Sequence, residues 1–333
     1  MRSPLLVTQD LAVGYGRRLL FESLSLCLRS NSFVCLIGAN GAGKSTLLKT
    51  LSGLREPIVG SVQLQGQNLH ELSPEQRAKQ LSLVLTDRLE LDWLSIEELV
   101  GLGRHPYTNW QGRLGKGDHE IVQQAIAAVG LSKLSQKSIT QISDGERQKA
   151  MIARALAQQT KLLILDEPTA YLDLPRRVEV MQLLRSLSHA EGRAVLMSTH
   201  DLDLALRSAD QLWLITESGN LIVGTPEELV LRGDLGETFS SDTFEFNQES
   251  GQFQLNYQRR SPIQLHGEGL VATWTIRALE RLGYAVTTEP TDLALDIHLN
   301  PECWSLKNGD RTNNFHSLGE LSDHLQALQY KNC

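Results

Sequence analysis

Cysteine, aromatic side chains and long apolar runs are all scarce in this sequence of 333 residues. Its four cysteines, Cys27, Cys35, Cys303 and Cys333, match neither a disulfide framework nor a metal site, which favours free thiols in a reducing cytosol. No apolar run approaches the ~20 residues of a membrane-spanning helix, and the first residues lack the apolar stretch of a secretory signal. The sequence therefore predicts a soluble cytosolic protein of two domains, or of one large domain with an appendage.

Positive charge is also in short supply. The sequence has 32 lysines and arginines against 39 aspartates and glutamates, so its net charge is −7. This balance argues against general affinity for nucleic acid or for anionic lipid. We therefore expect no nucleic-acid partner, and the function has to be sought in local motifs.

A glycine-rich stretch, GANGAGKST at residues 38–46, matches the phosphate-binding pattern G-x-x-x-x-G-K-[ST]. The apolar run 33–37 predicts a buried strand before it, and residues 47–51 predict a helix after it, which favours a phosphate site over a simple glycine-rich turn. Glycines let consecutive backbone N–H groups surround a phosphate at the helix N-terminus. Lys44 is expected to reach the β- and γ-phosphate oxygens of ATP, and Ser45 is expected to bind Mg²⁺. The expected nucleotide-binding residues of this loop are Gly38, Asn40, Gly41, Gly43, Lys44, Ser45 and Thr46.

Two adjacent carboxylates, Asp166 and Glu167, follow the apolar run 162–165. In a chain with a phosphate loop, such a pair at a strand end indicates a Mg²⁺ ligand and a base that activates water. An ordinary buried strand that ends in an acid is the alternative. His200 follows another predicted strand, residues 194–197, and becomes a further candidate because of that position, although an isolated histidine there is usually a surface residue.

The rest of the first 240 residues divides into a β-rich part and a helical part. Alternation of apolar and polar residues over 24–28 predicts one half-buried strand. Between residues 87 and 142, Ser95 and Glu98 form a capping box, and Asp118 is expected to cap a second helix. We interpret this stretch as a helical insertion between two parts of an α/β core.

Residues 251–333 hold none of these motifs and predict a small α+β appendage of unknown role. Helices are expected over 274–282 and 317–328, and Asn308-Gly309 predicts a hairpin. A metal site is the weaker alternative for this region because the spacing of its metal-ligating residue types gives it no support. These residues are His266, His298, Cys303, His316 and His324.

With these motifs in this order, the sequence resembles the ATP-binding-cassette (ABC) ATPases over residues 5–235. The resemblance implies that residues 38–46 are the Walker A loop, 162–166 the Walker B strand and 171–173 the D-loop. The individual roles that it implies are adenine stacking by Tyr15, Mg²⁺ binding by Ser45 and Asp166, catalysis by Glu167, contact with the γ-phosphate by His200, and completion of a second subunit's ATP site by Ser143 and Gly145 of the signature sequence.

This resemblance implies an α/β fold, a P-loop NTPase ABC cassette over residues 1–240 with a mixed β core and a helical subdomain at about 87–150. ATP and Mg²⁺ are the implied cofactors. The implied partners are a second copy in a head-to-tail dimer, membrane permease subunits and, indirectly, a substrate-binding protein, with the chain at the cytoplasmic face of the membrane. Residues 103–107 and 224–228 look most like the ATPases of iron–siderophore, haem and cobalamin importers.

Two residues depart from the family pattern. Asp144 stands where the signature usually has glycine, and its charge would repel a phosphate unless it points away or is paired. Thr86 stands where the family has a glutamine that touches Mg²⁺, so its part in metal binding is doubtful. The alternative function is a permease-free cytosolic ABC ATPase acting in repair, translation or cluster assembly, although the chain has neither a second Walker A loop nor a long coiled-coil insertion.

Overall fold

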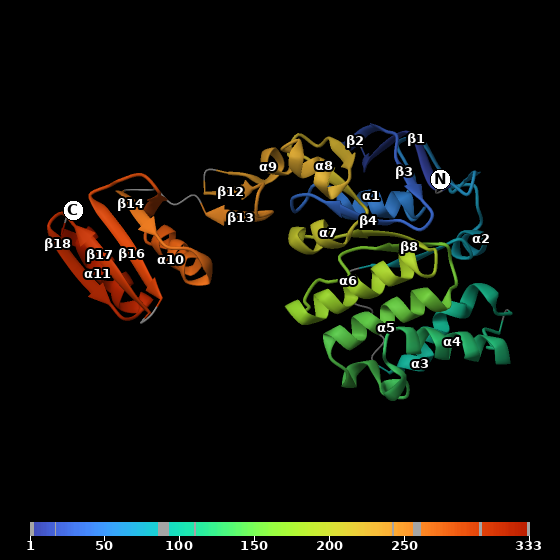
Figure 1. The fold of residues 1–333 in the computed structure, drawn as a ribbon. Coiled ribbons are helices and arrows are strands. Elements are labelled where there is room, and N and C mark those ends of the chain that lie inside the picture. Colours follow the sequence, from blue (N-terminus) through green and yellow to red (C-terminus); the bar gives the residue numbers. More distant parts are fainter. Residues whose placement is uncertain are drawn as a thin grey trace. The chain divides into compact units, whose positions relative to one another are not determined.

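The computed structural model describes residues 3–16, 18–85, 93–109, 111–241, 243–255, 261–299 and 302–331. Figure 1 shows the chain, which divides into two compact units. The first unit, called here the ATPase unit, comprises Met1–Ser240 and Phe246–Gln252. The second, called the C-terminal unit, comprises Ser241–Glu245 and Phe253–Cys333.

An antiparallel sheet at the N-terminus forms one layer of the ATPase unit. Its strand order is β2-β1-β5-β6, and β3 also pairs with β1. The single strand expected over 24–28 is wrong: β2 ends at Leu24 and β3 begins at Cys27, because the Thr8 hydroxyl donates to the Leu24 carbonyl and accepts the Leu26 N–H. The strands are β1 (Pro4–Tyr15), β2 (Arg18–Leu24), β3 (Cys27–Arg29), β5 (Val59–Leu64) and β6 (Gln67–Asn68).

The second sheet of this unit carries the phosphate loop and has the order β11-β10-β4-β9-β8-β7. Neighbours from β10 to β7 are parallel, and β11 is antiparallel to β10. Parallel strands covered on both faces are apolar throughout, which explains why the runs at 33–37 and 162–165 do not alternate. The strands are β4 (Phe33–Ile37), β7 (Leu81–Val84), β8 (Leu162–Leu165), β9 (Ala194–Ser198), β10 (Gln211–Ile215) and β11 (Leu221–Gly224).

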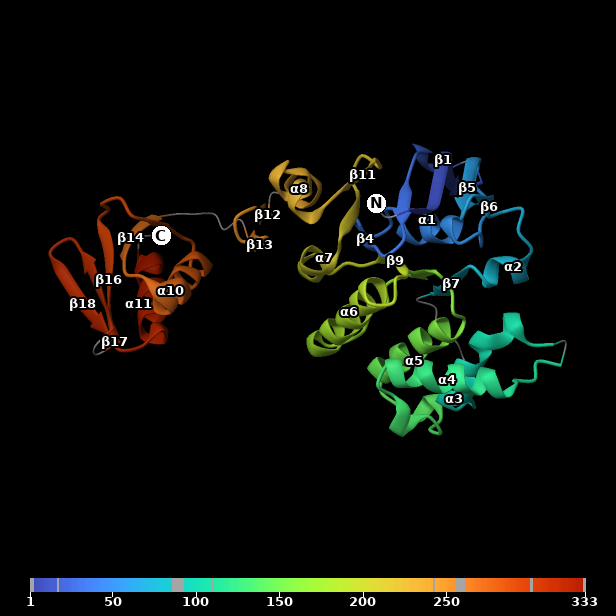
Figure 2. The ribbon, with the colours of Figure 1, turned by 45° about the vertical axis from the view of Figure 1, so that its right-hand side comes forward.

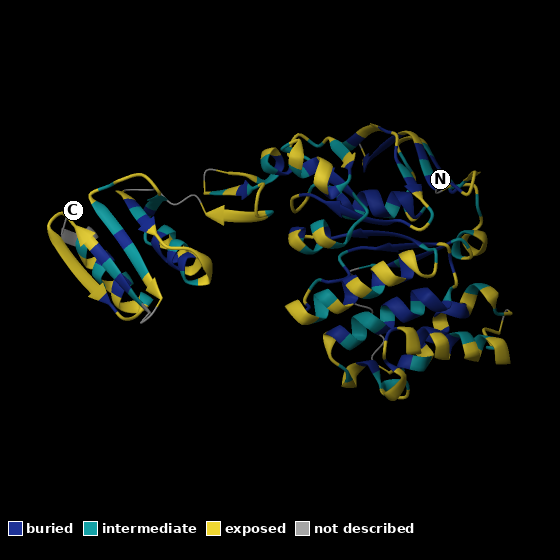
Figure 3. Ribbon diagram, viewed as in Figure 1, coloured by how far each residue is buried: buried dark blue, intermediate teal, exposed yellow. Residues whose placement is uncertain are grey.

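The two faces of the parallel sheet contribute to two different hydrophobic clusters. Phe33 and Cys35 belong to the cluster that holds the helices, whereas Val34 and Leu36 belong to the cluster with the antiparallel sheet and α1. Figure 3 shows these strands as an almost continuous buried layer. The helices of this part are α1 (Lys44–Leu51), α2 (Pro74–Ala78), α6 (Leu174–His189), α7 (Leu202–Ser208), α8 (Pro226–Leu231) and α9 (Asp234–Phe239).

A helical region lies between β7 and β8, and its helices α3, α4 and α5 pack against one another (Figure 2). The predicted capping box of Ser95 and Glu98 is confirmed at the start of α3. Asp118 is not an N-cap: α4 begins at Lys116, and the carboxylate accepts the Gly115 N–H from inside the first turn. The elements are α3 (Ile96–Gly101), η1 (Leu102–Tyr107), α4 (Lys116–Ala128), η2 (Ser132–Leu134), η3 (Ile139–Gln141) and α5 (Asp144–Ala157).

The C-terminal unit contains a mixed sheet of order β15-β14-β16-β17-β18, with α10 and α11. The predicted hairpin is confirmed, since Asn308 pairs with Arg311 across Gly309, whose φ is 57°. The helix expected from 274 begins earlier, at Gly269, because Ala272 already packs into the unit. Strands β12 (Phe244–Asn247) and β13 (Gln252–Leu255) pair with each other and contain residues of both units. The other elements are β14 (Ser261–His266), α10 (Gly269–Arg281), β15 (Tyr284–Thr287), β16 (Leu293–Leu299), β17 (Glu302–Asn308), β18 (Arg311–Phe315) and α11 (Leu318–Lys331).

Candidate nucleotide site

The loop between β4 and α1 has the backbone geometry that its glycines allow. Gly41 and Gly43 have φ values of 78° and 100°, a region that other residues rarely adopt. A Cβ at Gly38 would lie 2.9 Å from the Cβ of Ile215, so the loop can pass β10 only with glycine there. The loop therefore presents its backbone at the N-terminus of α1, where N–H groups favour an anion.

Lys44 is the buried cation of the loop, with 5% of its surface exposed. Its ammonium donates hydrogen bonds to the carbonyl oxygens of Gly38 at 2.9 Å and Ala39 at 3.0 Å. Burial lowers the pKa of Lys44, and the negative charges of Glu167 and Asp166 oppose that shift. A positive charge with little water around it interacts strongly with phosphate.

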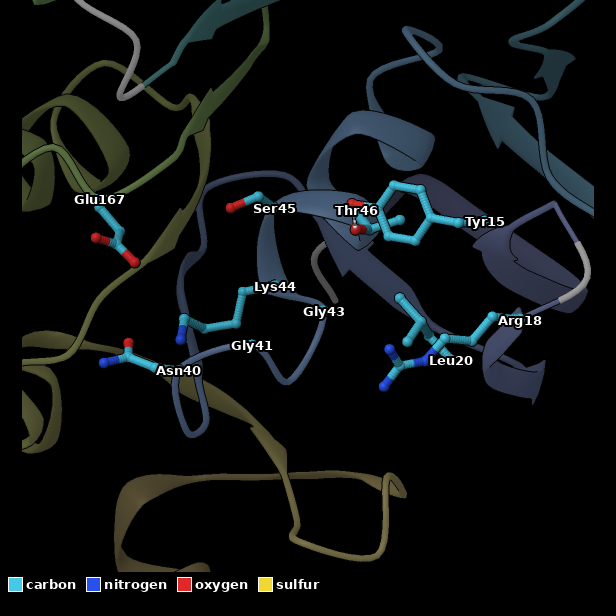
Figure 4. Close-up of a pocket in the computed structure, with 10 residues that line it drawn as sticks. All are labelled: Tyr15, Arg18, Leu20, Asn40, Gly41, Gly43, Lys44, Ser45, Thr46 and Glu167. Carbon is cyan, nitrogen blue, oxygen red and sulfur yellow. Dashed lines mark hydrogen bonds between the residues drawn. The ribbon is translucent and has the colours of Figure 1, made fainter.

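A cavity of about 250 Å³ opens over this loop. Figure 4 shows Glu167 on one side of the loop residues and Tyr15, Arg18 and Leu20 on the other. Arg18 and Leu20 come from β2, whose antiparallel pairing with β1 places them beside Tyr15, and they were not among the residues expected from the sequence. The lining residues are Tyr15, Arg18, Leu20, Asn40, Gly41, Gly43, Lys44, Ser45, Thr46 and Glu167.

Tyr15 is half exposed at the edge of this cavity, with 48% of its surface accessible. Its hydroxyl forms a hydrogen bond with the Thr46 hydroxyl. The Arg55 guanidinium carbon lies 4.3 Å from the ring centroid and covers one face of the ring. Arg55 was not among the residues expected from the sequence. Stacking of a purine on Tyr15 stays a prediction.

The two carboxylates lie at the carboxyl end of β8 in different environments. Asp166 is 4% exposed, whereas the Glu167 side chain is 26% exposed and lines the cavity. The Ser198 hydroxyl donates to Asp166 Oδ1 at 2.7 Å and accepts the Glu167 N–H at 2.9 Å. His200 Nε2 lies 2.5 Å from Glu167 Oε1, so the structure brings these predicted site residues together.

These oxygen groups suit Mg²⁺. In the described part of the chain no group of three or more His, Cys, Asp or Glu side chains is placed to hold a metal ion. Mg²⁺ needs no such group, since it takes one or two protein oxygens together with phosphate oxygens and water. The Ser45 hydroxyl and the Asp166 carboxylate are of that kind, so the residues present fit the ion. Thr86, the doubtful ligand, lies outside the described residues, as does the neighbouring Asp87.

The residues of the signature sequence do not line this cavity. Ser143 is the N-cap of α5 and accepts the Glu146 N–H, while the Glu146 carboxylate accepts the Ser143 N–H at 2.8 Å. The backbone N–H and the hydroxyl of Ser143 lower the pKa of Glu146. Gly145 is buried, and Asp144 is exposed to solvent. A role for Ser143 and Gly145 on nucleotide therefore requires a site other than that of their own chain.

Comparison with known proteins shows which family has this architecture. Residues 21–170 match the family model described as ABC transporter. An ABC transporter ATP-binding protein of Methanocaldococcus jannaschii is 40% identical over 260 residues, which are 78% of this chain and 89% of that protein. The chain belongs to the ABC transporter ATP-binding proteins. The resemblance inferred from the sequence is thus confirmed, and with it the fold class and the activity of an ATPase coupled to transport.

Other relatives and solved ABC structures agree with this assignment. The iron(3+)-hydroxamate import ATP-binding protein of Bacillus subtilis is 37% identical, over 71% of this chain and 88% of that protein. A solved ATP-binding subunit of an ABC transporter matches with a TM-score of 0.59 and 28% identity, over 71% of this chain and 95% of that chain. A structure described as a metal-chelate type ABC transporter matches with a TM-score of 0.63 and 27% identity, over 71% of this chain and 89% of that chain.

The C-terminal part of this ABC protein matches a second family model. Residues 260–326 match the model described as the iron ABC transporter C-terminal domain. The sequence motifs gave no role to this region, so the match adds information that they did not hold. Within the described residues, no helix combines the length and the apolar character needed to cross a membrane.

Proposed function

We propose that this ABC ATPase is the energy-supplying subunit of an importer for a metal chelate, with iron–siderophore complexes as the first substrate class and haem or cobalamin as the others. The observation that carries the proposal is the match of residues 260–326 to the iron ABC transporter C-terminal domain. Two relatives also support it: the iron(3+)-hydroxamate import protein of Bacillus subtilis and a ferric enterobactin transport protein of Escherichia coli. The Escherichia coli protein is 35% identical over 67% of this chain. A permease-free function in repair, translation or cluster assembly has no comparable support.

The proposed chemistry assigns a role to each group at the cavity. Lys44 and the loop N–H groups hold the β- and γ-phosphates, and the Tyr15 ring takes the adenine. Ser45 and Asp166 would hold Mg²⁺, which supplies charge neutralisation on the phosphates when bound. Glu167 orients and polarises the attacking water, and His200, 2.5 Å from Glu167, contacts the γ-phosphate.

The proposed assembly supplies what one chain lacks. Ser143 and Gly145 lie at the N-terminus of α5, outside the cavity of their own chain. In a head-to-tail dimer they would complete the ATP site of the second copy, with the exposed Asp144 turned away from the phosphate. The dimer would bind permease subunits at the cytoplasmic face of the membrane and act indirectly on a substrate-binding protein. We further propose that the cassette occupies residues 1–240 and the appendage 251–333.

An uptake assay tests this proposal. Cells that lack the chain are supplied with wild type or Lys44→Ala, and accumulation of a radiolabelled ferric siderophore is compared with that of haem and cobalamin. We expect wild type to restore uptake of the siderophore and Lys44→Ala to fail. Restored uptake of haem or cobalamin alone would change the substrate class, whereas failure to restore uptake of any chelate, or to co-purify with a permease, would contradict the proposal.

A further inference from the structure

Ser198, the last residue of β9, contacts both the Asp166 carboxylate and the Glu167 backbone but belongs to none of the sequence motifs. It is fully buried. Its Oγ lies 2.7 Å from Asp166 Oδ1 and 2.9 Å from the Glu167 backbone nitrogen. A serine hydroxyl has one proton to donate and two lone pairs that accept, so one oxygen can serve both neighbours.

The backbone at Glu167 is one that needs support. Its φ of 50° lies in the left-handed region, which residues other than glycine adopt rarely and retain only where their surroundings hold them. This conformation follows directly after β8, and it turns the chain so that Asp166 stays buried while Glu167 reaches the cavity. The hydrogen bond from the Glu167 N–H to Ser198 holds the chain at this turn.

Strand pairing does not explain why residue 198 carries a hydroxyl group. Strands β8 and β9 pair through their backbones up to Leu165 and Met197, and Ser198 itself pairs with Leu36 of β4. These ladders use main-chain groups, which any residue except proline supplies. The Ser198 side chain instead joins the ends of two strands where both carboxylates project.

We infer that Ser198 is a positioning residue for ATP hydrolysis: its hydroxyl orients Asp166 toward Mg²⁺ and fixes the backbone from which Glu167 reaches the attacking water. The inference rests on the roles proposed above for Asp166 and Glu167. One side chain thereby sets the direction of the metal ligand and of the base together. Groups that orient a metal ligand through a hydrogen bond typically affect metal affinity or activity by about 10–100-fold.

The test compares three full-length variants with wild type. Ser198→Ala removes the hydroxyl, and Ser198→Cys replaces it by a weak donor of similar shape. Ser188→Ala is the matched control, because Ser188 is also a fully buried serine but its Oγ has no hydrogen-bond partner. For each protein we would measure the melting temperature, the kcat for ATP, and the Kd for ATP with and without Mg²⁺.

We expect both Ser198 variants to lose roughly 10–100-fold in kcat while the Kd for ATP without Mg²⁺ stays within about 2-fold of wild type. The gain in ATP affinity on adding Mg²⁺ should shrink, which a merely structural role would not produce. Ser188→Ala should match wild type in all three measurements. If Ser198→Ala does not fold, Ser198→Cys gives the same readout.

Two results would overturn the inference. One is wild-type kcat and wild-type response to Mg²⁺ in a folded Ser198 variant. The other is an equal loss of ATP affinity with and without Mg²⁺ together with a lower melting temperature, which would make Ser198 a packing residue only. Failure of the proposed function itself is distinguishable, because Glu167→Gln would then retain hydrolysis whatever the Ser198 variants do.

Discussion

Buried polar groups are used differently in the two units of this chain. The ATPase unit buries polar side chains at several places, and four of them, Lys44, Thr46, Asp166 and Ser198, lie together at the phosphate loop or at the strand ends beside it. In the described part of the C-terminal unit, Thr275 alone is a buried polar residue, and it accepts the Trp304 Nε1–H at 2.9 Å. Burying polar groups is costly unless they are paired, so a group of four beside one cavity, two of them charged, marks the chemical site, whereas an isolated neutral pair marks packing.

The C-terminal unit has a charged cluster, Asp296, His266 and Lys307, on its sheet. Asp296 accepts from His266 Nδ1 at 2.7 Å and pairs with Lys307 at 3.0 Å, and the His266 and Lys307 side chains are more than half exposed. His266 and Lys307 lower the pKa of Asp296. Charges so well solvated contribute little to stability, so this network does not resemble the buried site of the ATPase unit.

The largest difference between the units should appear when a lysine is removed from each. Lys44→Ala deletes the buried ammonium beside the loop and should weaken ATP binding by roughly 10–100-fold, since a hydrogen bond to a charged group contributes about 1.5–3 kcal/mol. Lys307→Ala, in the exposed network, should leave ATP affinity unchanged. Calorimetric titration of both variants with ATP checks this, and equal effects would remove the distinction between the units.

Thr275→Val should destabilise the C-terminal unit and spare the ATP site. The change leaves the buried Trp304 indole N–H without its acceptor, at a cost of about 1–3 kcal/mol. The exposed Thr273 on the same helix is the control, and Thr273→Val should cost much less. Denaturation followed by tryptophan fluorescence, beside ATPase activity, measures both effects. Loss of ATPase activity in folded Thr275→Val would contradict this prediction.

Asp118 in the helical region should make stability depend on acid pH. The Gly115 N–H and, after it, Arg104 lower the pKa of Asp118 in the folded state. Stability from the ionised group is therefore fully present above the pKa of the unfolded chain, ~4, and is lost as pH falls through the lowered folded value. Asp118→Asn should remove about 1 kcal/mol at neutral pH and flatten this acid-side loss.

The counterpart in the C-terminal unit is Asp296→Asn. The direction should be the same, because the pKa of Asp296 is also lowered, but the effect should be smaller since its partners are exposed. Urea unfolding at pH values between 3 and 7 compares the two variants. If wild type and Asp118→Asn lost equal free energy of unfolding as the pH falls, Asp118 would not be the source of the acid-side loss.

The smallest effect is expected from ending the chain near Gly251. The residues that line the cavity all precede Gly251, so ATP affinity and basal hydrolysis should stay within about 2-fold of wild type once circular dichroism confirms the fold. Control of transport or dimer stability should change instead. Lost ATP binding in a folded truncation would show that the C-terminal unit shapes the site.

The sequence predicted the site where chemistry depends on contiguous residues. The loop from Gly38 to Thr46 and the pair Asp166–Glu167 are local motifs with their strand and helix context, and the structure places both at one edge of the parallel sheet. Ser198 could not be selected in that way, because it is 32 residues from Asp166 and becomes a partner only when β8 and β9 pair. Arg55 at the Tyr15 ring depends likewise on the folded arrangement.

Errors in the predicted elements have local physical causes. The strand predicted over 24–28 is wrong because alternation indicates which face a side chain takes, whereas the break depends on the distant Thr8 hydroxyl, which bonds to the Leu24 carbonyl and the Leu26 N–H. The prediction of Asp118 as an N-cap is wrong because a carboxylate is also common three residues inside the N-cap, where it accepts the N–H of the N-cap residue, here Gly115. The role of the C-terminal unit was not predictable, since its polar residues have no spacing that indicates one chemistry.

The most direct test of the account is hydrolysis by Glu167→Gln. The account assigns Glu167 to the attacking water, so this variant should keep its affinity for ATP and lose ~10²–10⁴ in kcat. Glu237→Gln, at an exposed position on α9, is the control and should match wild type. Single-turnover hydrolysis of ATP with Mg²⁺ gives the rate. Hydrolysis by folded Glu167→Gln within a few-fold of wild type would contradict the assignment of Glu167 as the catalytic base.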